Sequence, residues 1–266
     1  MGPDEYQVMA DMETIHWWFL ARMELVDRLM GMVIDRYLTL DRTPPRDDLV
    51  GSSPRGLKIL DLGCGTGSVL ESLGRFGDAV GVDISPQALS LSRRRGLRRL
   101  VLGSGDKLPF KDGSFDAVVA LDCFEHIQDD MAALSESYRV LRPGGVLLTH
   151  VPAIGFLWSE HDEALHHRRR YSRLELRDKL TYAGFLLPFL TYSQCLLFPL
   201  ILMFRVFSCF SKRGILPRAN VHRVWSPLNR LLLYINRLDH VLAANLGCPV
   251  GVSLVSVATK TTGGTT

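Results

Sequence analysis

A glycine-rich turn directly after a short apolar stretch constrains this chain more than any other feature. Residues 61–67 read Asp-Leu-Gly-Cys-Gly-Thr-Gly and follow the apolar run from Leu57 to Leu60. The pattern predicts a buried strand that ends in a turn against a nucleoside cofactor, because glycine lets a ligand approach where a Cβ would block it. The glycines are spaced G-x-G-x-G, whereas a dinucleotide site needs G-x-G-x-x-G, and Ser68 takes the place of the last glycine. The spacing therefore argues against NAD.

The pattern after this turn predicts alternating strands and helices. A second strand at 79–83 ends in Asp83, where folds of this type place an acid against ribose hydroxyls. The other predicted strands are 99–102, 115–121, 146–151, 185–192 and 250–260, and the predicted helices are 68–76, 86–95, 131–141 and 173–183. Such alternation indicates an α/β fold with a parallel sheet that has helices on both faces.

Four segments between residues 57 and 153 resemble, in order, the motifs of the class I S-adenosylmethionine (SAM) dependent methyltransferases. Besides the glycine turn they are GSGDKLPFKDGSFD at 103–116, LDCFEHI at 121–127 and RVLRPGG at 139–145. Within that family the chain is similar to the small-molecule methyltransferases of quinone biosynthesis. The resemblance implies a doubly wound, seven-stranded, mostly parallel, Rossmann-like sheet whose last strand is antiparallel. It also implies SAM as the cofactor.

The same resemblance assigns the cofactor site. Relatives often carry G-D-A-E-x-L-P-F in the adenine-binding turn, with an acid two residues before the Glu. Here Ser104 holds the first of these positions and Asp106 the second, so which side chain meets the adenine amino group stays open. The residues expected to bind SAM are Asp61, Gly63, Cys64, Gly65, Gly67, Asp83, Ile84, Ser104, Gly105, Asp106 and Leu121.

Outside this core, the chain is expected to be helical at its start and before its last strand. Apolar residues at helical spacing predict one amphipathic helix from residue 13 to about 40. We divide the chain into an N-terminal helical extension (1–42), a polar linker (43–56), the SAM-binding core (57–194), a helical insertion (195–249), the last strand of the core (250–260) and a disordered tail (261–266).

The insertion at 195–249 is expected to be a substrate lid or a membrane contact. It holds seven Lys and Arg residues against one acid, Asp239, although the net charge of the whole chain is only +3. The 25 residues from Leu180 to Phe204 carry no charge and are long enough to span a bilayer. Prolines interrupt them, however, and an interfacial helix or plain core packing explains the run better than a membrane span does.

A second helix of the insertion is predicted to start with Ser226 as N-cap and Pro227 at the next position. Its apolar stripe consists of Leu228, Leu231, Leu232, Ile235, Leu238 and Leu242. Apolar helices flanked by Lys and Arg suit an anionic membrane surface or an apolar substrate.

Methyl transfer from a sulfonium mainly requires a nucleophile held in line and shielded from water, and a base adds about 10² to 10⁴-fold. Candidate bases lie after the fourth and fifth strands, near their carboxyl ends: His126, His161, His166 and His167. For His126 the alternative is that Glu125-His126 only packs. We expect no metal, because no cysteine pair or H-x-x-x-H helix is present.

The acceptor is expected to meet aromatic and basic side chains. Trp17 and Trp18 offer an aromatic wall for SAM or substrate, or else a staple between a helix and the sheet. Arg168, Arg170 and Tyr171 can bind an anionic group of the substrate, or else form a solvated lead-in to a helix.

Composition narrows the class of protein. A net charge of +3 with 22% charged residues argues against a nucleic-acid partner, and five cysteines without a paired motif suggest reduced thiols. The acidic N-terminus predicts no signal peptide, so we expect a cytoplasmic protein, with peripheral contact at the inner, anionic face of the membrane left open. We expect a methyltransferase acting on a small, lipophilic or lipid-linked acceptor; the alternative is an inactive SAM-binding partner or sensor.

Overall fold

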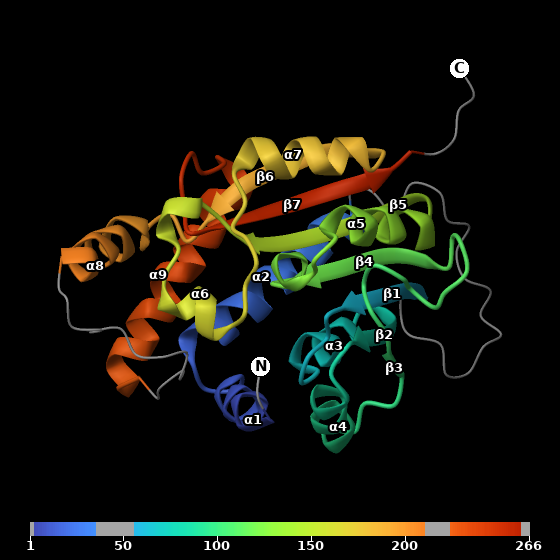
Figure 1. Cartoon of the computed structure of the whole chain (residues 1–266), viewed down its shortest axis with the longest axis horizontal. Coiled ribbons are helices and arrows are strands. Elements are labelled where there is room, and N and C mark those ends of the chain that lie inside the picture. Colours follow the sequence, from blue (N-terminus) through green and yellow to red (C-terminus); the bar gives the residue numbers. More distant parts are fainter. Residues whose placement is uncertain (1–2, 36–55, 211–223, 262–266) are drawn as a thin grey trace.

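The computed structural model describes residues 3–35, 56–210 and 224–261, and these form one seven-stranded sheet with helices on both faces (Figure 1). The strands are β1 Leu57–Leu62, β2 Gly77–Asp83, β3 Leu100–Leu102, β4 Phe115–Leu121, β5 Leu141–Pro152, β6 Phe185–Ser193 and β7 Ser253–Lys260. Their order is β3-β2-β1-β4-β5-β7-β6, and β7 runs antiparallel to both of its neighbours. The predicted fold class is confirmed.

Four helices of the core agree with the sequence pattern, and a fifth, Glu160–Ala164, was not predicted. They are α3 Ser68–Leu73, α4 Pro86–Arg94, α5 Asp130–Val140, α6 Glu160–Ala164 and α7 Arg173–Tyr182, with short 3-10 turns η2 Phe124–His126 and η3 Gly155–Leu157. The side chain of Ser172 caps α7 by accepting from the Glu175 N–H. Gly184 follows in the left-handed region at φ 95°, which stops the helix before β6.

Two apolar layers hold the helices to the sheet. On one face, Ala133, Leu134 and Val140 of α5 and the buried leucines of α7 pack on β4, β5 and β7. On the other face, Leu25, Leu29 and Met30 of helix α2 (Trp17–Val33) pack on β1, β4 and β5, together with α3. Because both faces are covered, β4 is buried at every residue, as a central parallel strand should be.

The single helix predicted from residue 13 to about 40 is wrong: the N-terminal region forms two helices, α1 Pro3–Met12 and α2 Trp17–Val33. The break lies at His16, whose backbone is extended and whose Nδ1 accepts from the Trp18 N–H at 3.3 Å. A side-chain cap of this kind starts a new helix and competes with continuation of the old one. Residues 36–55, which include most of the expected linker, lie outside the described part.

The insertion contains helices α8 Phe198–Phe210 and α9 Ser226–Asn245. The N-cap of α9 is Trp225, one residue before the predicted Ser226, and its side chain makes no capping bond. Four of the basic residues counted above (Lys212, Arg213, Arg218 and Arg223) and the tail from 262 lie outside the described residues. No described helix combines the length and apolar character needed to cross a membrane.

Helix α9 buries polar residues and exposes apolar ones. Its buried residues are Asn236, Asp239, His240 and Ala243. Its exposed large apolar residues are Leu228, Leu231, Tyr234, Leu238 and Val241. The predicted stripe is therefore split, because Leu228, Leu231 and Leu238 face solvent. This inverts the arrangement of an ordinary surface helix.

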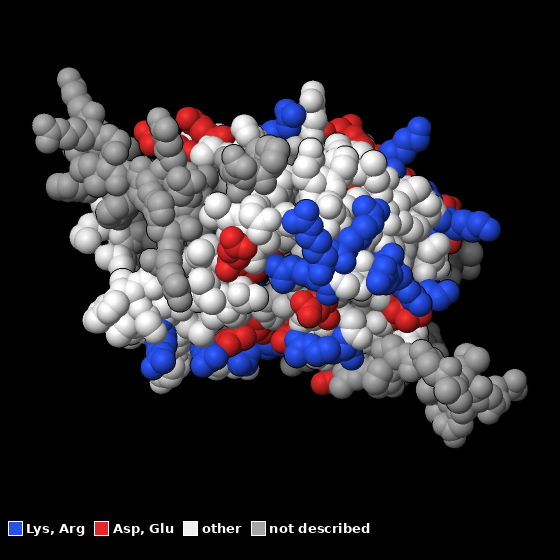
Figure 2. Space-filling model, turned by 90° about the horizontal axis from the view of Figure 1, so that it is seen from below, with Lys and Arg blue, Asp and Glu red and all other residues white. Residues whose placement is uncertain are grey.

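Basic side chains gather over α4 on the face drawn in Figure 2, with acidic side chains among them. The chain has five arginines there: Arg93, Arg94, Arg95, Arg98 and Arg99. Arg95 pairs with Glu13 of the N-terminal segment, and Arg99 pairs with Asp78 at 3.1 Å. At least two of these arginines are therefore committed to ion pairs within the protein.

Candidate active site

The turn after β1 requires its glycines. Gly63, Gly65 and Gly67 have φ values of 75°, 52° and 88°, in the left-handed region that favours glycine. A Cβ on Gly63 would lie 2.6 Å from the Cys123 sulfur, and one on Gly67 would lie 2.5 Å from a methyl carbon of Leu97. The turn is thus packed on its inner side and offers bare backbone at the carboxyl edge of the sheet.

Asp83 ties the end of β2 to this turn. Its Oδ2 accepts from the Gly65 N–H and its Oδ1 accepts from the Ser85 N–H, both at 2.8 Å. Burial raises the pKa of Asp83, and these backbone bonds oppose the rise. The next residue, Ile84, is 72% exposed. A half-buried carboxylate beside an exposed apolar side chain suits a nucleoside, which has ribose hydroxyls and an apolar base.

Asp61 is the least satisfied group near the turn. Its side chain is 2% exposed, and its Oδ2 has no hydrogen-bond partner among the described residues. Burial raises its pKa to about 7, with Arg22 opposing the rise and Asp83 and Glu13 adding to it. A buried acceptor of this kind is costly unless a ligand supplies a donor. The ammonium group of SAM has the charge and the donors that fit.

The N-terminal segment closes over the turn. The Thr66 hydroxyl donates to Glu13 Oε1 at 2.5 Å, and Glu13 is itself buried. A Cβ on Gly65 would lie 3.5 Å from the terminal methyl of Met9, which belongs to α1. Helix α1 therefore shields the glycine turn from water.

The remaining predicted cofactor residues differ in access. Ser104 is half-buried, Asp106 is exposed, and Gly105 is packed so closely that a Cβ would lie 2.8 Å from Ile127 Cδ1. Cys64 and Leu121 are buried at 6% and 7% exposure, so they support the turn from within. Burial raises the pKa of the Cys64 thiol, which keeps it protonated.

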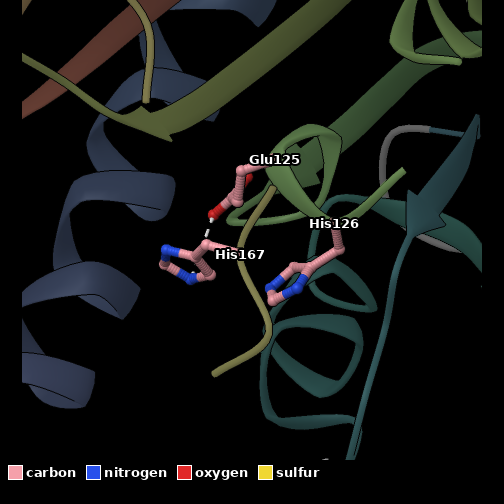
Figure 3. A group of neighbouring side chains, drawn as sticks. All are labelled: Glu125, His126 and His167. Carbon is pink, nitrogen blue, oxygen red and sulfur yellow. Dashed lines mark ion pairs between the residues drawn. The ribbon is translucent and has the colours of Figure 1, made fainter. Parts of the chain in front are cut away.

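A second cluster combines Glu125 and His126 of η2 with His167, which follows α6. In Figure 3 the Glu125 carboxylate points toward His167, and the rings of the two histidines lie edge to face. Glu125 Oε1 is 4.0 Å from His167 Nε2, and the ring centroids are 4.8 Å apart. His167 Nδ1 is 2.9 Å from Asp162 Oδ1, which in turn accepts from Arg170 Nε at 2.8 Å.

The electrostatics of this cluster favour proton chemistry. Glu125 is fully buried, and neither of its carboxylate oxygens has a hydrogen-bond partner among the described residues. Burial raises its pKa well above the usual range, and the nearby Asp122 charge adds to this. Burial, with His167 beside it, lowers the pKa of His126 to about 4, so the ring is neutral at pH 7. A protonated carboxyl next to neutral imidazole can hold or pass a proton.

Ligand atoms of Glu125, His126 and His167 all lie within 4.8 Å of one another, so the cluster can also hold a divalent cation. Asp162 would then orient His167 from behind, as carboxylates do for metal-bound histidines. A second such group is Cys195, Asp239 and Cys248. In neither group do the residues follow one another at the sequence spacing of a known metal motif, so the sequence analysis predicted no metal site.

The other residues predicted for catalysis or substrate binding are placed as follows. The His166 side chain is exposed, and the side chain of His161 lies outside the described part, so the structure brings together only His126 and His167. Arg168 is exposed and donates to the His126 carbonyl.

Arg170 and Tyr171 serve the packing of their own segment. Arg170 is bound to Asp162 and the Ala153 carbonyl, and the buried Tyr171 hydroxyl donates to Asp130 at 2.8 Å. These partners occupy the polar groups that were predicted to meet a substrate. We therefore leave both residues out of the acceptor site.

The two tryptophans at the start of α2 are half-buried. The backbone N–H of Trp17 donates to Asn229 Oδ1 of α9 at 2.8 Å, and this bond joins the N-terminal segment to the insertion. The Trp18 ring lies 4.9 Å from the Arg22 guanidinium carbon and stacks edge to face on Phe19. Trp18 is thus part of the wall between α2 and the sheet edge.

A third polar group, which the sequence did not indicate, lies at the ends of β4 and β5. Asp122 Oδ1 is 2.7 Å from His150 Nδ1, and Asp122 Oδ2 accepts from Arg22 at 3.0 Å. Burial opposes ionisation here, but His150 and Arg22 hold the pKa of Asp122 well below its usual range. Asp122 has a φ of 49°, a strained value for a residue other than glycine. His150 lies within the apolar strand β5, two residues before its end, and nothing in its local pattern marks it.

Comparison with known proteins agrees with this geometry. Residues 60–149 match the family model described as methyltransferase domain. A demethylmenaquinone methyltransferase of Tropheryma whipplei is 41% identical over 98 residues, which are 35% of this chain and 41% of that protein. A ubiquinone biosynthesis O-methyltransferase of Xanthomonas oryzae is 35% identical over 115 residues, which are 41% of this chain and 46% of that protein. The chain thus spans less than half the length of these two relatives.

Solved structures share the fold. A phosphoethanolamine N-methyltransferase 2 of Haemonchus contortus, determined with SAM bound, superposes with a TM-score of 0.51 at 19% identity, covering 88% of this chain and 52% of the other. The YcgJ protein of Bacillus subtilis gives 0.53 at 14% identity, covering 89% and 100%. Residues 60–149 thus match a methyltransferase domain, and the fold and the glycine turn are those of the class I methyltransferases, the kind that uses S-adenosylmethionine as its cofactor.

Proposed function

We propose that this protein is an enzyme that transfers the methyl group of SAM to a small, lipophilic acceptor. The observation that carries the proposal is the bare glycine turn whose Gly65 N–H is bound by Asp83, with the unsatisfied carboxylate of Asp61 beside it. Asp83 beside the turn suits the ribose hydroxyls of SAM, and the Asp61 carboxylate suits its ammonium group.

The chain's own residues would position and shield the reactants. SAM supplies an electrophilic methyl group, so the protein needs mainly to exclude water and orient the acceptor. Helix α1 covers the glycine turn, and Trp18 of α2 lies beside the adjacent sheet edge. Glu125, His126 and His167 lie beyond the end of β4, where they could receive a proton from the group that first takes it from the acceptor.

A lipophilic acceptor is supported by the insertion and by the named relatives. Two of these relatives are named for demethylmenaquinone and for ubiquinone biosynthesis, which concern isoprenoid quinones. The exposed apolar residues of α8 and α9 include Leu200, Met203, Leu231 and Tyr234. Such a surface suits peripheral contact with an anionic bilayer from which an apolar acceptor is taken.

The alternative function, an inactive protein that only binds SAM, has less support. The relatives named above are methyltransferases. A protein that only senses SAM also has no need for a buried, unpaired Glu125 beside two histidines, because an unpaired buried carboxyl reduces stability.

Calorimetric titration with SAM and with its demethylated product S-adenosylhomocysteine tests the cofactor site. Asp83→Ala removes a charge-assisted partner worth about 1.5 to 3 kcal/mol, so affinity should fall about 10- to 100-fold. Gly65→Val introduces a β-branched side chain at φ 52° and should also abolish tight binding. Asp112→Ala, at an exposed position far along the chain from the turn, is the control and should bind as wild type. Equal affinity in all four proteins would refute the proposal.

A further inference from the structure

A small cavity between α2, α9 and the ends of β5 and β6 contains an unusual number of unpaired polar atoms. It is about 10 Å³, room for about one water-sized group. Arg22 Nε, Ser193 Oγ and Asn236 Oδ1 are buried there without a hydrogen-bond partner among the described residues. A buried polar atom left unpaired destabilises the folded state. One group of the size of a water molecule, either water or the hydroxyl of a ligand, is needed to pair these three atoms.

The unpaired atoms require a ligand that both donates and accepts. The Asn236 amide nitrogen donates to the Leu232 carbonyl at 2.9 Å, which leaves its oxygen to accept from the cavity. Arg22 Nε can only donate, and a serine hydroxyl can do either. A hydroxyl group accepts from the arginine and donates to the amide oxygen, whereas a carboxylate or a ketone cannot donate at all.

The charges around the cavity favour a neutral ligand. The Arg22 guanidinium is paired with the Asp122 carboxylate at 3.0 Å. Burial lowers the pKa of His240, which also lines the cavity, to about 4, so that ring is neutral near pH 7. The other walls include Leu25 and the ring of Trp18. The hydroxyl group of an uncharged alcohol suits this cavity, which has room for that group alone, better than an anionic group does.

The cavity adjoins the cofactor turn. Asp122 directly precedes Cys123, whose sulfur packs on Gly63. Arg22 is also close enough to Asp61 to lower the pKa of that carboxyl. A hydroxyl bound among these residues would therefore lie next to the site at which SAM is proposed to bind.

We propose that this cavity holds the hydroxyl oxygen of a neutral acceptor and that His150 is the catalytic base that takes its proton. The inference rests on the proposed function and assigns it to the class of O-methylation. The acceptor oxygen attacks the methyl carbon, a C–O bond forms, the C–S bond breaks, and its electron pair stays on sulfur. Since a hydroxyl has a single proton, its O–H turns from the Asn236 oxygen to His150 Nε2 before the transfer, and the proton passes to Nε2 because Asp122 already occupies Nδ1. Asp122 and Arg22 are positioning residues that stabilise the imidazolium.

Binding of two neutral probes tests this assignment. The protein, saturated with S-adenosylhomocysteine, is titrated with catechol and with 1,2-dimethoxybenzene, which lacks the hydroxyl protons. Wild type should bind catechol about 2- to 10-fold more tightly, since the bond that the ether lacks is the one from the hydroxyl to the neutral Asn236 oxygen, which contributes about 0.5 to 1.5 kcal/mol. Asn236→Leu should lose that preference. Asn245→Leu is the matched control, because Asn245 lies on the same helix and makes the same bond to a carbonyl four residues back, but is exposed.

Turnover tests the base. On guaiacol formation from catechol, His150→Gln should lower kcat about 10² to 10⁴-fold, with KM and the affinity for S-adenosylhomocysteine unchanged. An unchanged kcat removes His150 as the base. If wild type does not distinguish the two probes, or Asn236→Leu still does, the cavity is not the acceptor site. Loss of S-adenosylhomocysteine binding in wild type would instead refute the proposed function, so the two failures are distinguishable.

Discussion

Replacing Asp61 by Asn should make the ligand-free protein more stable and at the same time weaken its binding of SAM. The carboxylate is buried without a partner for Oδ2, and burial raises its pKa from 3.8 to about 7. Keeping it ionised at pH 8 therefore costs the folded state about 4 kcal/mol. Asn has nearly the same shape but no charge, so the substitution removes this cost.

The direction of the pKa shift determines how the free energy of unfolding changes with pH. Because the folded pKa of Asp61 lies above the unfolded one, the folded protein binds more protons between pH 4 and pH 7. The contribution of Asp61 to the free energy of unfolding thus decreases as the pH rises through this window, and the full penalty is present above pH 7. Asp61→Asn should gain up to about 4 kcal/mol at pH 8 and little at pH 4.

Urea unfolding at pH 4.5, 6 and 8, combined with calorimetry, measures both effects. The mutant should gain stability only toward pH 8, while its affinity for SAM falls about 10- to 100-fold through loss of a charge-assisted bond. Asp78→Asn is the control, since Asp78 has a half-exposed side chain paired with Arg99. A mutant that is no more stable than wild type at pH 8, or that binds SAM equally well, would refute this account of Asp61.

Three further predictions concern other parts of the molecule. His167→Ala should lower turnover while SAM affinity stays, if the Glu125 cluster carries the proton; unchanged turnover would exclude this. Arg170→Ala should lower the free energy of unfolding by about 3 to 5 kcal/mol, because it leaves Asp162 buried without its guanidinium partner, and a loss below 1 kcal/mol in urea unfolding would contradict the ion pair. The protein should cosediment with anionic liposomes at low salt and less at high salt, and Leu231→Ser with Leu238→Ser should weaken this; wild type remaining in the supernatant would end the membrane proposal.

The cofactor turn was predictable because its signals are local. The spacing of Gly63, Gly65 and Gly67 and the position of Asp83 reflect backbone geometry within two adjacent strands. Each strand of the core is likewise a short apolar run between turn residues, so its place follows from periodicity. The α/β class and the mostly parallel, seven-stranded sheet with its antiparallel last strand follow from the alternation together with the family resemblance.

The acceptor side was not predictable because its residues meet only in the folded chain. Arg22, His150 and Asn236 come from three distant elements, and each reads locally as an ordinary helix or strand residue. The polar side of helix α9 was not predictable for a related reason: its apolar stripe was read as a surface for a membrane or an apolar substrate, but nothing in the pattern showed that Asn236, Asp239 and His240 would be buried. Conversely, Arg170 and Tyr171 looked like ligand-binding residues, but tertiary contacts with Asp162 and Asp130 occupy them.

Transfer of a labelled methyl group tests the central claim most directly. The purified protein is incubated with SAM labelled on its methyl group and with a short-chain demethylmenaquinol or a hydroxylated quinol. We expect label to enter the organic-soluble product, with one S-adenosylhomocysteine formed per methyl group transferred, and no label to enter it with Asp83→Ala at a SAM concentration near the wild-type Kd. The account would be contradicted if the protein binds SAM but transfers no label to any hydroxylated or quinol acceptor, or if Asp83→Ala transfers it as fast as wild type.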